Sequence, residues 1–272
     1  MATTPLRNPD RLDDITTHFY RDVLDRLDAA QIPALVGGGF ALRTYTGISR
    51  DTKDLDVFIF PGDVERVIKL FVDAGYKTDL TYPHWLGKVH QADRVVDLIF
   101  SSGNGLCRVD GAWFVHARED MVLDRAVWVA PPEEIIWQKA FIMERHRYDG
   151  ADVIHLLRSQ GSKLDWDRLL SRFGEHWPVL LSHLLLARFV YPEEESDAAR
   201  SAIRTLMRKL TEQMDQGYWT SLHSPVVCRG TFLSLLEYLP AVEQWGYRDA
   251  RLPPTGYMSA EMIDHWTTNF ER

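Results

Sequence analysis

Two aspartates at alternate positions open an apolar segment of this sequence, and a glycine-rich turn precedes them. The segment LVGGGFALRTYTGISRDTKDLDVFIF covers residues 35–60, with the glycines at 37–39 and the acids at Asp54 and Asp56. Aspartate is disfavoured in strands and costly to bury without a partner. Alternate side chains of a strand lie on one face, so both carboxylates are expected to point the same way. Such a strand needs a compensating cation near its start.

A divalent metal ion is the predicted cation. Two neighbouring carboxylates repel each other in an apolar setting, and they stay ionised only if a cation neutralises them. Oxygen ligands of this kind suit Mg²⁺ or Mn²⁺. A third acid, Asp97, interrupts the apolar segment VVDLIF, and on a neighbouring strand it would complete a site for one or two metal ions. The alternative is that Asp54 and Asp56 pair with Arg50 and Lys53 in a solvated edge strand.

The three glycines predict a phosphate site. Gly37, Gly38 and Gly39 lack a Cβ, so a ligand can approach their backbone closely. If a helix begins directly after them, its free N–H groups favour a bound phosphate. A tight turn without a ligand is the alternative for the glycines taken alone. Phosphate, strand carboxylates and Mg²⁺ together indicate nucleotidyl transfer, in which metal ions orient a triphosphate and activate an acceptor hydroxyl.

These elements resemble the nucleotidyltransferase superfamily related to DNA polymerase β. The shared pattern is a strand, a Gly-Gly turn, a helix, a strand with Asp-x-Asp and a third acid on a later strand, over residues 30–100. The segments RDTKDLD and PPEEIIWQKAF to RYDGADVIHLL are most similar to the small bacterial members grouped around the AbiEii-type toxins. The triple glycine leaves open which two glycines correspond to the family's pair.

The resemblance implies roles for the residues of the N-terminal part. Asp54, Asp56 and Asp97 would hold Mg²⁺ or Mn²⁺ and act in catalysis, with Asp97 also as a base. Gly37–Gly39 and Lys53 would bind the nucleotide.

A lysine in the C-terminal part is also a candidate. The resemblance implies that Lys139 lies near the site as a catalytic cation, and that Asp149 or Asp152 matches an acid of the next helix. The alternative is a lysine on an ordinary amphipathic helix with its charge in solvent.

The resemblance implies metal-dependent transfer of a nucleoside monophosphate (NMP) from a nucleoside triphosphate (NTP) to an acceptor hydroxyl. The acceptor is open between tRNA, a protein side chain and a small antibiotic-like molecule. The rival is a non-catalytic nucleotide-binding or toxin–antitoxin interaction protein on the same fold, with a cognate antitoxin as its partner. The presence of all three acids favours the enzyme.

Strand patterns are concentrated before residue 130, and helical patterns follow. The sequence therefore predicts an α+β (mixed α/β) fold. A nucleotidyltransferase core over residues 1–130, with a small mixed sheet flanked by helices, precedes a mainly helical C-terminal domain over 131–272. Asp63 is expected to cap a helix that stops at Gly75. The expected strands are 34–36, 54–60, 85–90, 94–100 and 126–130, and the further helices include 9–29, 150–159, 165–173, 175–190, 195–214, 230–244 and 259–270.

Composition restricts the setting. The 272 residues are 45% hydrophobic and 26% charged, which is typical of a globular protein. A net charge of −8 argues against a generally basic nucleic-acid binder, although a local patch near Arg145–Arg158 would suffice for RNA. Two cysteines are too few for a disulfide framework, so a reducing cytoplasm is expected. The apolar run WPVLLSHLLLARFVY is too short and polar to span a bilayer, and no membrane partner is expected.

Overall fold

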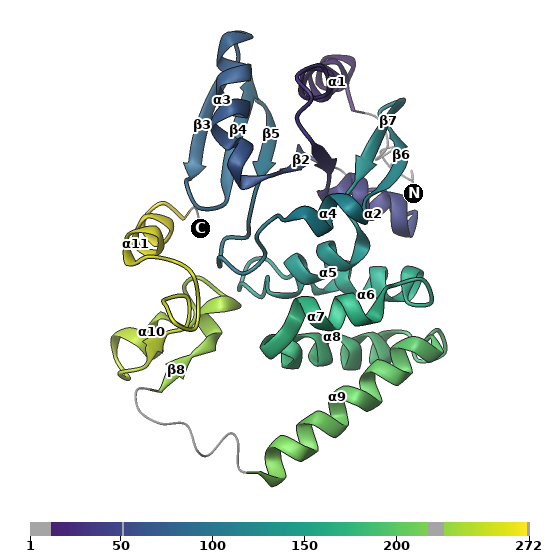
Figure 1. Ribbon diagram of the computed structural model, residues 1–272, viewed down its shortest axis with the longest axis vertical. Helices are drawn as coiled ribbons and strands as arrows, with labels where there is room; N and C mark the ends of the chain where they lie inside the picture. Colours follow the sequence, from purple (N-terminus) through teal and green to yellow (C-terminus); the bar gives the residue numbers. More distant parts are fainter. Residues whose placement is uncertain (1–11, 51, 217–225, 271–272) are drawn as a thin grey trace, which may run out of the picture. The chain divides into compact units, whose positions relative to one another are not determined.

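The computed structural model describes residues 12–50, 52–216 and 226–270, and the chain divides into two compact units (Figure 1). The second unit consists of Ser101–Arg108 and Pro131–Arg272, and the first unit consists of the chain before and between these segments. The chain therefore enters the second unit, returns to the first, and enters the second again.

A seven-stranded mixed sheet forms the centre of the first unit. Its strands are β1 (Ala34–Val36), β2 (Asp54–Ile59), β3 (Lys77–Tyr82), β4 (Leu86–Gln91), β5 (Arg94–Ile99), β6 (Arg118–Val122) and β7 (Arg125–Val129). Their order is β3-β4-β5-β2-β1-β7-β6. β2 pairs in parallel with β5 and antiparallel with β1, so it is a central strand. The alternative of a solvated edge strand for Asp54 and Asp56 is therefore wrong.

In its described residues, the first unit has the α-helices α1 (Asp14–Ala29), α2 (Gly38–Thr46), α3 (Val64–Asp73) and α4 (Gly111–Val115). The Asp13 side chain caps α1 by accepting a hydrogen bond from the backbone N–H of Thr16 at 2.8 Å. Phe19 and Val23 of α1 are buried as the helical periodicity predicts, whereas Ile15 is 62% exposed. The buried apolar face of α1 therefore begins at Phe19.

The two faces of the sheet differ in polarity at its centre. Ile68 of α3 lies 3.6 Å from the position that a Cβ would take at Gly87 on β4, so α3 packs on the apolar face (Figure 1). Because alternate residues of a strand lie on opposite faces, the acids of β2 and β5 lie on the other face. The buried residues of the apolar face on these two strands are Leu55, Val57, Ile59, Val96 and Leu98.

The second unit is mainly helical. Its helices are α5 (Pro132–Ala140), α6 (Gly150–Gln160), α7 (Trp166–Phe173), α8 (Trp177–Val190), α9 (Asp197–Asp215), α10 (Leu239–Glu243) and α11 (Ala260–Thr268), with a two-stranded ribbon of β8 (Val227–Cys228) and β9 (Arg248–Asp249). Glu134 of α5 is fully buried and accepts hydrogen bonds from Arg168 and Arg172 of α7, which compensates its charge. Within the described ranges, no helix has the length and apolar character needed to cross a membrane.

Three sequence-based predictions of local structure are wrong. Residues 230–244 do not form one helix, because a short 3-10 turn ends at Phe232 and Pro240 starts α10 afresh. Asp63 takes the N-cap position of α3 without a capping hydrogen bond, and its carboxylate lies 3.9 Å from Arg66 Nη1 instead. The strands β3 and β6 were not expected. They are the two edges of the sheet, where a strand needs less apolar sequence than at the centre.

Candidate active site

The glycine turn packs against the carboxylate of Asp56, a side chain of the same protein. Gly37 is the N-cap of α2, and its backbone N–H donates to the carbonyl oxygen of Asp56 at 2.9 Å. Gly38 has a φ of +52°, in the left-handed region that favours glycine. A Cβ at Gly38 would lie 1.6 Å from Asp56 Oδ2, and one at Gly39 would lie 2.4 Å from Thr52 Oγ1. The missing side chains therefore let the Asp56 carboxylate lie against the start of α2.

The parallel pairing of β2 and β5 places two of the acids side by side. Asp56 is in register with Asp97, and Asp54 lies two residues earlier on the same face of β2. Tyr20 of α1 lies within the electrostatic field of all three. Burial raises the pKa of its hydroxyl, and the charges of Asp54, Asp56 and Asp97 raise it further. The three acids therefore share one face of the sheet and one electrostatic environment.

The Asp97 side chain is largely buried beside Lys88. It is 15% exposed, and within the described part of the chain its Oδ1 has no hydrogen-bond partner. Burial raises the pKa of Asp97, the ammonium of Lys88 opposes this rise, and the charge of Asp54 adds to it. The ionised carboxylate is thus only partly compensated by the groups around it.

The donor chemistry of the acids fits a hard divalent cation. A buried carboxylate oxygen that makes no hydrogen bond and only a 3.5 Å ion pair with Lys88, beside a second carboxylate in register, is a setting in which a cation supplies the missing interaction. No three carboxylate, histidine or cysteine side chains among the described residues lie close enough, as they stand, to hold a metal ion together. The ligand roles of Asp54, Asp56 and Asp97 therefore stay predictions.

The incomplete compensation of the Asp97 charge predicts an effect on stability. Because its folded-state pKa is raised, ionised Asp97 opposes folding at neutral pH. We expect Asp97→Asn to raise the free energy of unfolding of the metal-free protein at pH 7 by on the order of 1 kcal/mol, since unsatisfied buried polar groups cost about 1–3 kcal/mol. The difference in unfolding free energy between variant and parent should shrink as the pH falls through the folded-state pKa of Asp97. It should vanish once Asp97 of the parent is protonated in both the folded and the unfolded state.

Urea unfolding of parent and variant at pH 7 and pH 3.5 measures this difference. Asp73→Asn is the control, because Asp73 lies on the surface of α3 in an exposed pair with Lys69 and should have little effect. A destabilising Asp97→Asn at pH 7 would show that the charge is well compensated without a metal.

Lys53 immediately precedes β2. Its side chain is exposed, and its backbone carbonyl accepts a hydrogen bond from the Tyr20 hydroxyl at 3.4 Å. This long contact links α1 to the start of β2. Nucleotide binding by Lys53 stays a prediction.

Lys139 lies in the second unit, on α5, and is held by two carboxylates. Its Nζ lies 2.6 Å from Asp149 Oδ2 and 2.9 Å from Asp152 Oδ2. The residue is 8% exposed, so the alternative of a lysine with its charge in solvent is wrong. Burial alone would raise the pKa of Asp149, but the hydrogen bond from Arg147 and the charge of Lys139 lower it to about 2. A catalytic role of Lys139 stays a prediction.

The low pKa of Asp149 predicts acid-sensitive stability of the second unit. A depressed folded-state pKa contributes stability above the unfolded-state pKa, and this stability is lost as the pH falls through about 2. We expect Asp149→Asn to lower the free energy of unfolding at pH 7 by on the order of 2 kcal/mol. The difference from the parent should narrow between pH 4 and pH 2. Thermal unfolding across this range measures it, with exposed Asp167→Asn as the control; an equal deficit at pH 2 would contradict the ion-pair origin.

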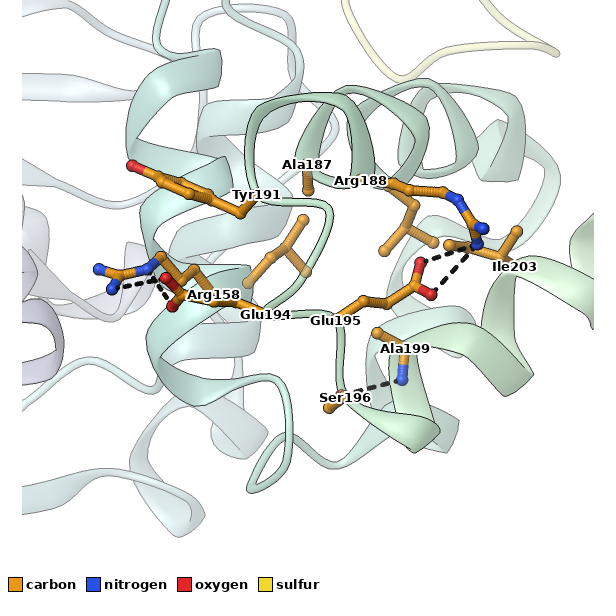
Figure 2. A pocket seen from close by; sticks show the side chains of 11 residues that line it. Arg158, Ala187, Arg188, Tyr191, Glu194, Glu195, Ser196, Ala199 and Ile203 are labelled. Carbon is orange, nitrogen blue, oxygen red and sulfur yellow. Dashed lines mark hydrogen bonds and ion pairs between the residues drawn. The ribbon is translucent and has the colours of Figure 1, made fainter.

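A small hollow in the second unit lies between α6, α8 and α9 (Figure 2). Its rim is closed by ion pairs of Arg158 with Glu194 and of Arg188 with Glu195. Its volume of about 30 Å³ admits a water molecule, whereas ligand pockets measure roughly 300–1,000 Å³. This hollow is therefore not a nucleotide site.

Sequence reasoning did not identify two residues beside the acids, Tyr20 and Lys88. The sequence pattern indicates only that Tyr20 is a buried residue of an amphipathic helix. Lys88 alternates with apolar neighbours in WLGKVH, which places it on a polar face but not beside any particular strand. Only the register of β4 against β5 puts Lys88 opposite Asp97.

The comparisons with known proteins give distant structural similarity. No family model and no curated protein matches the chain. Among solved structures it is similar to the antibiotic-resistance factor ANT(2'')-Ia (16% identity, TM-score 0.43, 63% of this chain and 98% of that chain). It is also similar to the lincosamide antibiotic adenylyltransferase LnuA (18% identity, TM-score 0.39, 53% of this chain and 96% of that chain). A third similar structure is that of an antigenic nucleotidyltransferase-like protein from Paracoccidioides brasiliensis (14% identity, TM-score 0.38, 75% of this chain and 92% of that chain). All three TM-scores lie below 0.5, so a functional assignment depends on the residues of the site.

Proposed function

We propose that the protein catalyses metal-dependent transfer of an NMP group from an NTP to an acceptor hydroxyl. The observation that carries this proposal is the position of Asp56. Its carboxylate lies against Gly38 at the start of α2, and its strand position is in register with Asp97. A cation held by the acids and a phosphate at the helix N-terminus would be neighbours in this arrangement.

Each residue would act through its charge and position. Asp54, Asp56 and Asp97 would hold Mg²⁺ or Mn²⁺, which when bound neutralises the polyphosphate and stabilises the leaving pyrophosphate. Asp97, with its raised pKa, is the proposed acceptor of the proton from the attacking hydroxyl.

The remaining candidates would contact the nucleotide. The backbone of Gly37–Gly39 at the start of α2 would orient a phosphate, and Lys53 would add a positive charge near it. We propose that Lys139 stabilises charge on the leaving group, with Asp149 and Asp152 fixing the position of its ammonium.

The acceptor is one of three classes, namely tRNA, a protein side chain or a small antibiotic-like molecule, and a cognate antitoxin would be a regulatory partner. Purified protein is incubated with each of the four NTPs, labelled at the α-phosphate, and Mg²⁺. Pyrophosphate release and transfer of label to each acceptor class are then measured. We expect release that stops on chelation of the metal. Nucleotide binding without pyrophosphate release, with every acceptor class, would favour the non-catalytic alternative.

A further inference from the structure

A row of four charged residues crosses the polar face of the sheet. The register places Asp79 of β3 opposite Lys88 of β4, Lys88 opposite Asp97 of β5, and Asp97 opposite Asp56 of β2. Registered residues of neighbouring strands lie on the same face, so the four side chains alternate in charge except for the last pair. Lys88 therefore stands between the candidate metal ligands and the edge of the sheet.

The charges of Asp97 and Asp79 attract the ammonium of Lys88 from both sides, but its ion pair with Asp97 is long. Its Nζ lies 3.5 Å from Asp97 Oδ1, longer than the roughly 2.7–2.9 Å of a charge-assisted hydrogen bond. Asp79, on the other side, is engaged by the ring Nε2 of His90 and the hydroxyl of Thr81. The Lys88 side chain is 29% exposed, so a ligand on this face can reach it.

The other basic group near the start of β5 is committed elsewhere. Arg94 donates to the Thr16 hydroxyl at 2.7 Å and pairs with Asp13 and Asp93. These contacts tie its guanidinium to α1 and to the turn before β5. Lys88, by contrast, is placed directly opposite Asp97 by the strand register.

We propose that Lys88 binds the triphosphate of the donor nucleotide. This inference rests on the proposed function, because a cation held by Asp56 and Asp97 would bring phosphate oxygens beside Asp97. Once that cation compensates Asp97, the attraction between Asp97 and Lys88 is weakened, and the ammonium can donate to the phosphate oxygens. A compact ammonium with three donors suits a polyphosphate, whose oxygens present charge in several directions.

The proposal predicts that loss of the Lys88 charge weakens binding of the nucleotide but does not weaken binding of Mg²⁺ alone. Lys88→Met should weaken binding of a non-hydrolysable NTP with Mg²⁺ by about tenfold to a hundredfold, the range for a lost hydrogen bond to a charged group. The same variant should bind Mg²⁺ alone as tightly as the parent or more tightly, because a positive charge beside the ligands has gone. If Lys88 only positioned Asp97, both affinities would fall.

Calorimetric titration of the full chain with Mg²⁺ alone, with Mg²⁺ and the non-hydrolysable NTP, and with Mg²⁺ and inorganic triphosphate measures these affinities. The loss should be equally large for inorganic triphosphate, which has no base or sugar. Lys69→Met is the matched control, because Lys69 pairs with Asp73 on the surface of α3 and should leave every affinity unchanged. Lys88→Arg keeps the charge, and should bind the triphosphate more tightly than Lys88→Met even if the methionine variant folds poorly.

The outcomes separate this inference from the proposed function. A parent that binds the triphosphate, with unchanged affinity in Lys88→Met, overturns the role of Lys88 alone. A loss confined to the nucleotide and absent with inorganic triphosphate also overturns it, as does a parallel loss of Mg²⁺ binding. A parent that binds neither triphosphate overturns both proposals.

Discussion

Replacing Asp56 by asparagine is expected to reduce Mg²⁺-dependent pyrophosphate release by about a thousandfold. The amide keeps the size of the side chain but removes the charge that would hold the cation. A metal ion supplies several kcal/mol of transition-state stabilisation, and each 1.36 kcal/mol is a factor of ten in rate. The loss should appear in the chemical step and persist at saturating NTP.

The steady-state rate of pyrophosphate release, with folding checked by circular dichroism, measures this effect. Asp63→Asn is the matched control: Asp63 lies in the same unit, at the start of α3, and its side chain makes no capping hydrogen bond. Its rate should equal that of the parent. A rate for Asp56→Asn within tenfold of the parent would remove Asp56 from the catalytic site.

Gly38→Ala is expected to impair both folding and transfer. The new Cβ would lie 1.6 Å from Asp56 Oδ2, and the residue would keep a φ of +52°, which alanine rarely adopts. Backbone strain of this kind costs about 1–3 kcal/mol. Because the Asp56 carboxylate must move, we expect the rate of transfer to fall about as far as in Asp56→Asn.

Urea unfolding and pyrophosphate release of Gly38→Ala test this expectation, with Gly62→Ala as the control. Nothing lies within 4 Å of a Cβ at Gly62, so that variant should behave as the parent. The loss of stability in Gly38→Ala should be smaller when Asp56 is already alanine, because the clashing carboxylate is then absent. An equal loss in both backgrounds would show that the strain comes from the backbone alone.

The acids of β2 follow from local rules of sequence, whereas their surroundings depend on the assembled sheet. The shared face of Asp54 and Asp56 requires only that a strand forms, because the alternation of side chains is intrinsic to extended backbone. The pairing of Asp56 with Asp97 depends on the register between two strands 41 positions apart, and the position of Lys88 depends on one further register. Such registers are set by tertiary packing, which a local pattern does not contain.

The glycine turn shows how a correct residue can be identified for an incomplete reason. From the sequence, the absence of a Cβ at Gly38 and Gly39 is interpreted as room for a phosphate to approach the backbone. In the structure the space that a Cβ would take is filled by Asp56 and Thr52 of the chain itself. The glycines are therefore needed for the internal packing of the site before any ligand is considered. Their contribution to phosphate binding would come from the backbone N–H groups at the start of α2.

Lys139 illustrates the opposite difficulty. Its spacing on an amphipathic helix is compatible with an exposed lysine, and only the packing of α5 and α6 shows that it is buried between Asp149 and Asp152. The edge strands β3 and β6 were also missed, because exposed edges need little apolar periodicity.

Binding of Mn²⁺ followed by electron paramagnetic resonance tests the central claim most directly. Mn²⁺ accepts the same oxygen ligands as Mg²⁺, and its signal reports bound and free ion without any need for turnover. The full chain is titrated with Mn²⁺, with and without a non-hydrolysable NTP. The parent should bind Mn²⁺, and more tightly when the nucleotide is present. This binding should be lost in Asp56→Asn and Asp97→Asn but kept in Asp63→Asn. Equal Mn²⁺ binding in the parent and all three variants would contradict a metal site formed by these strand carboxylates.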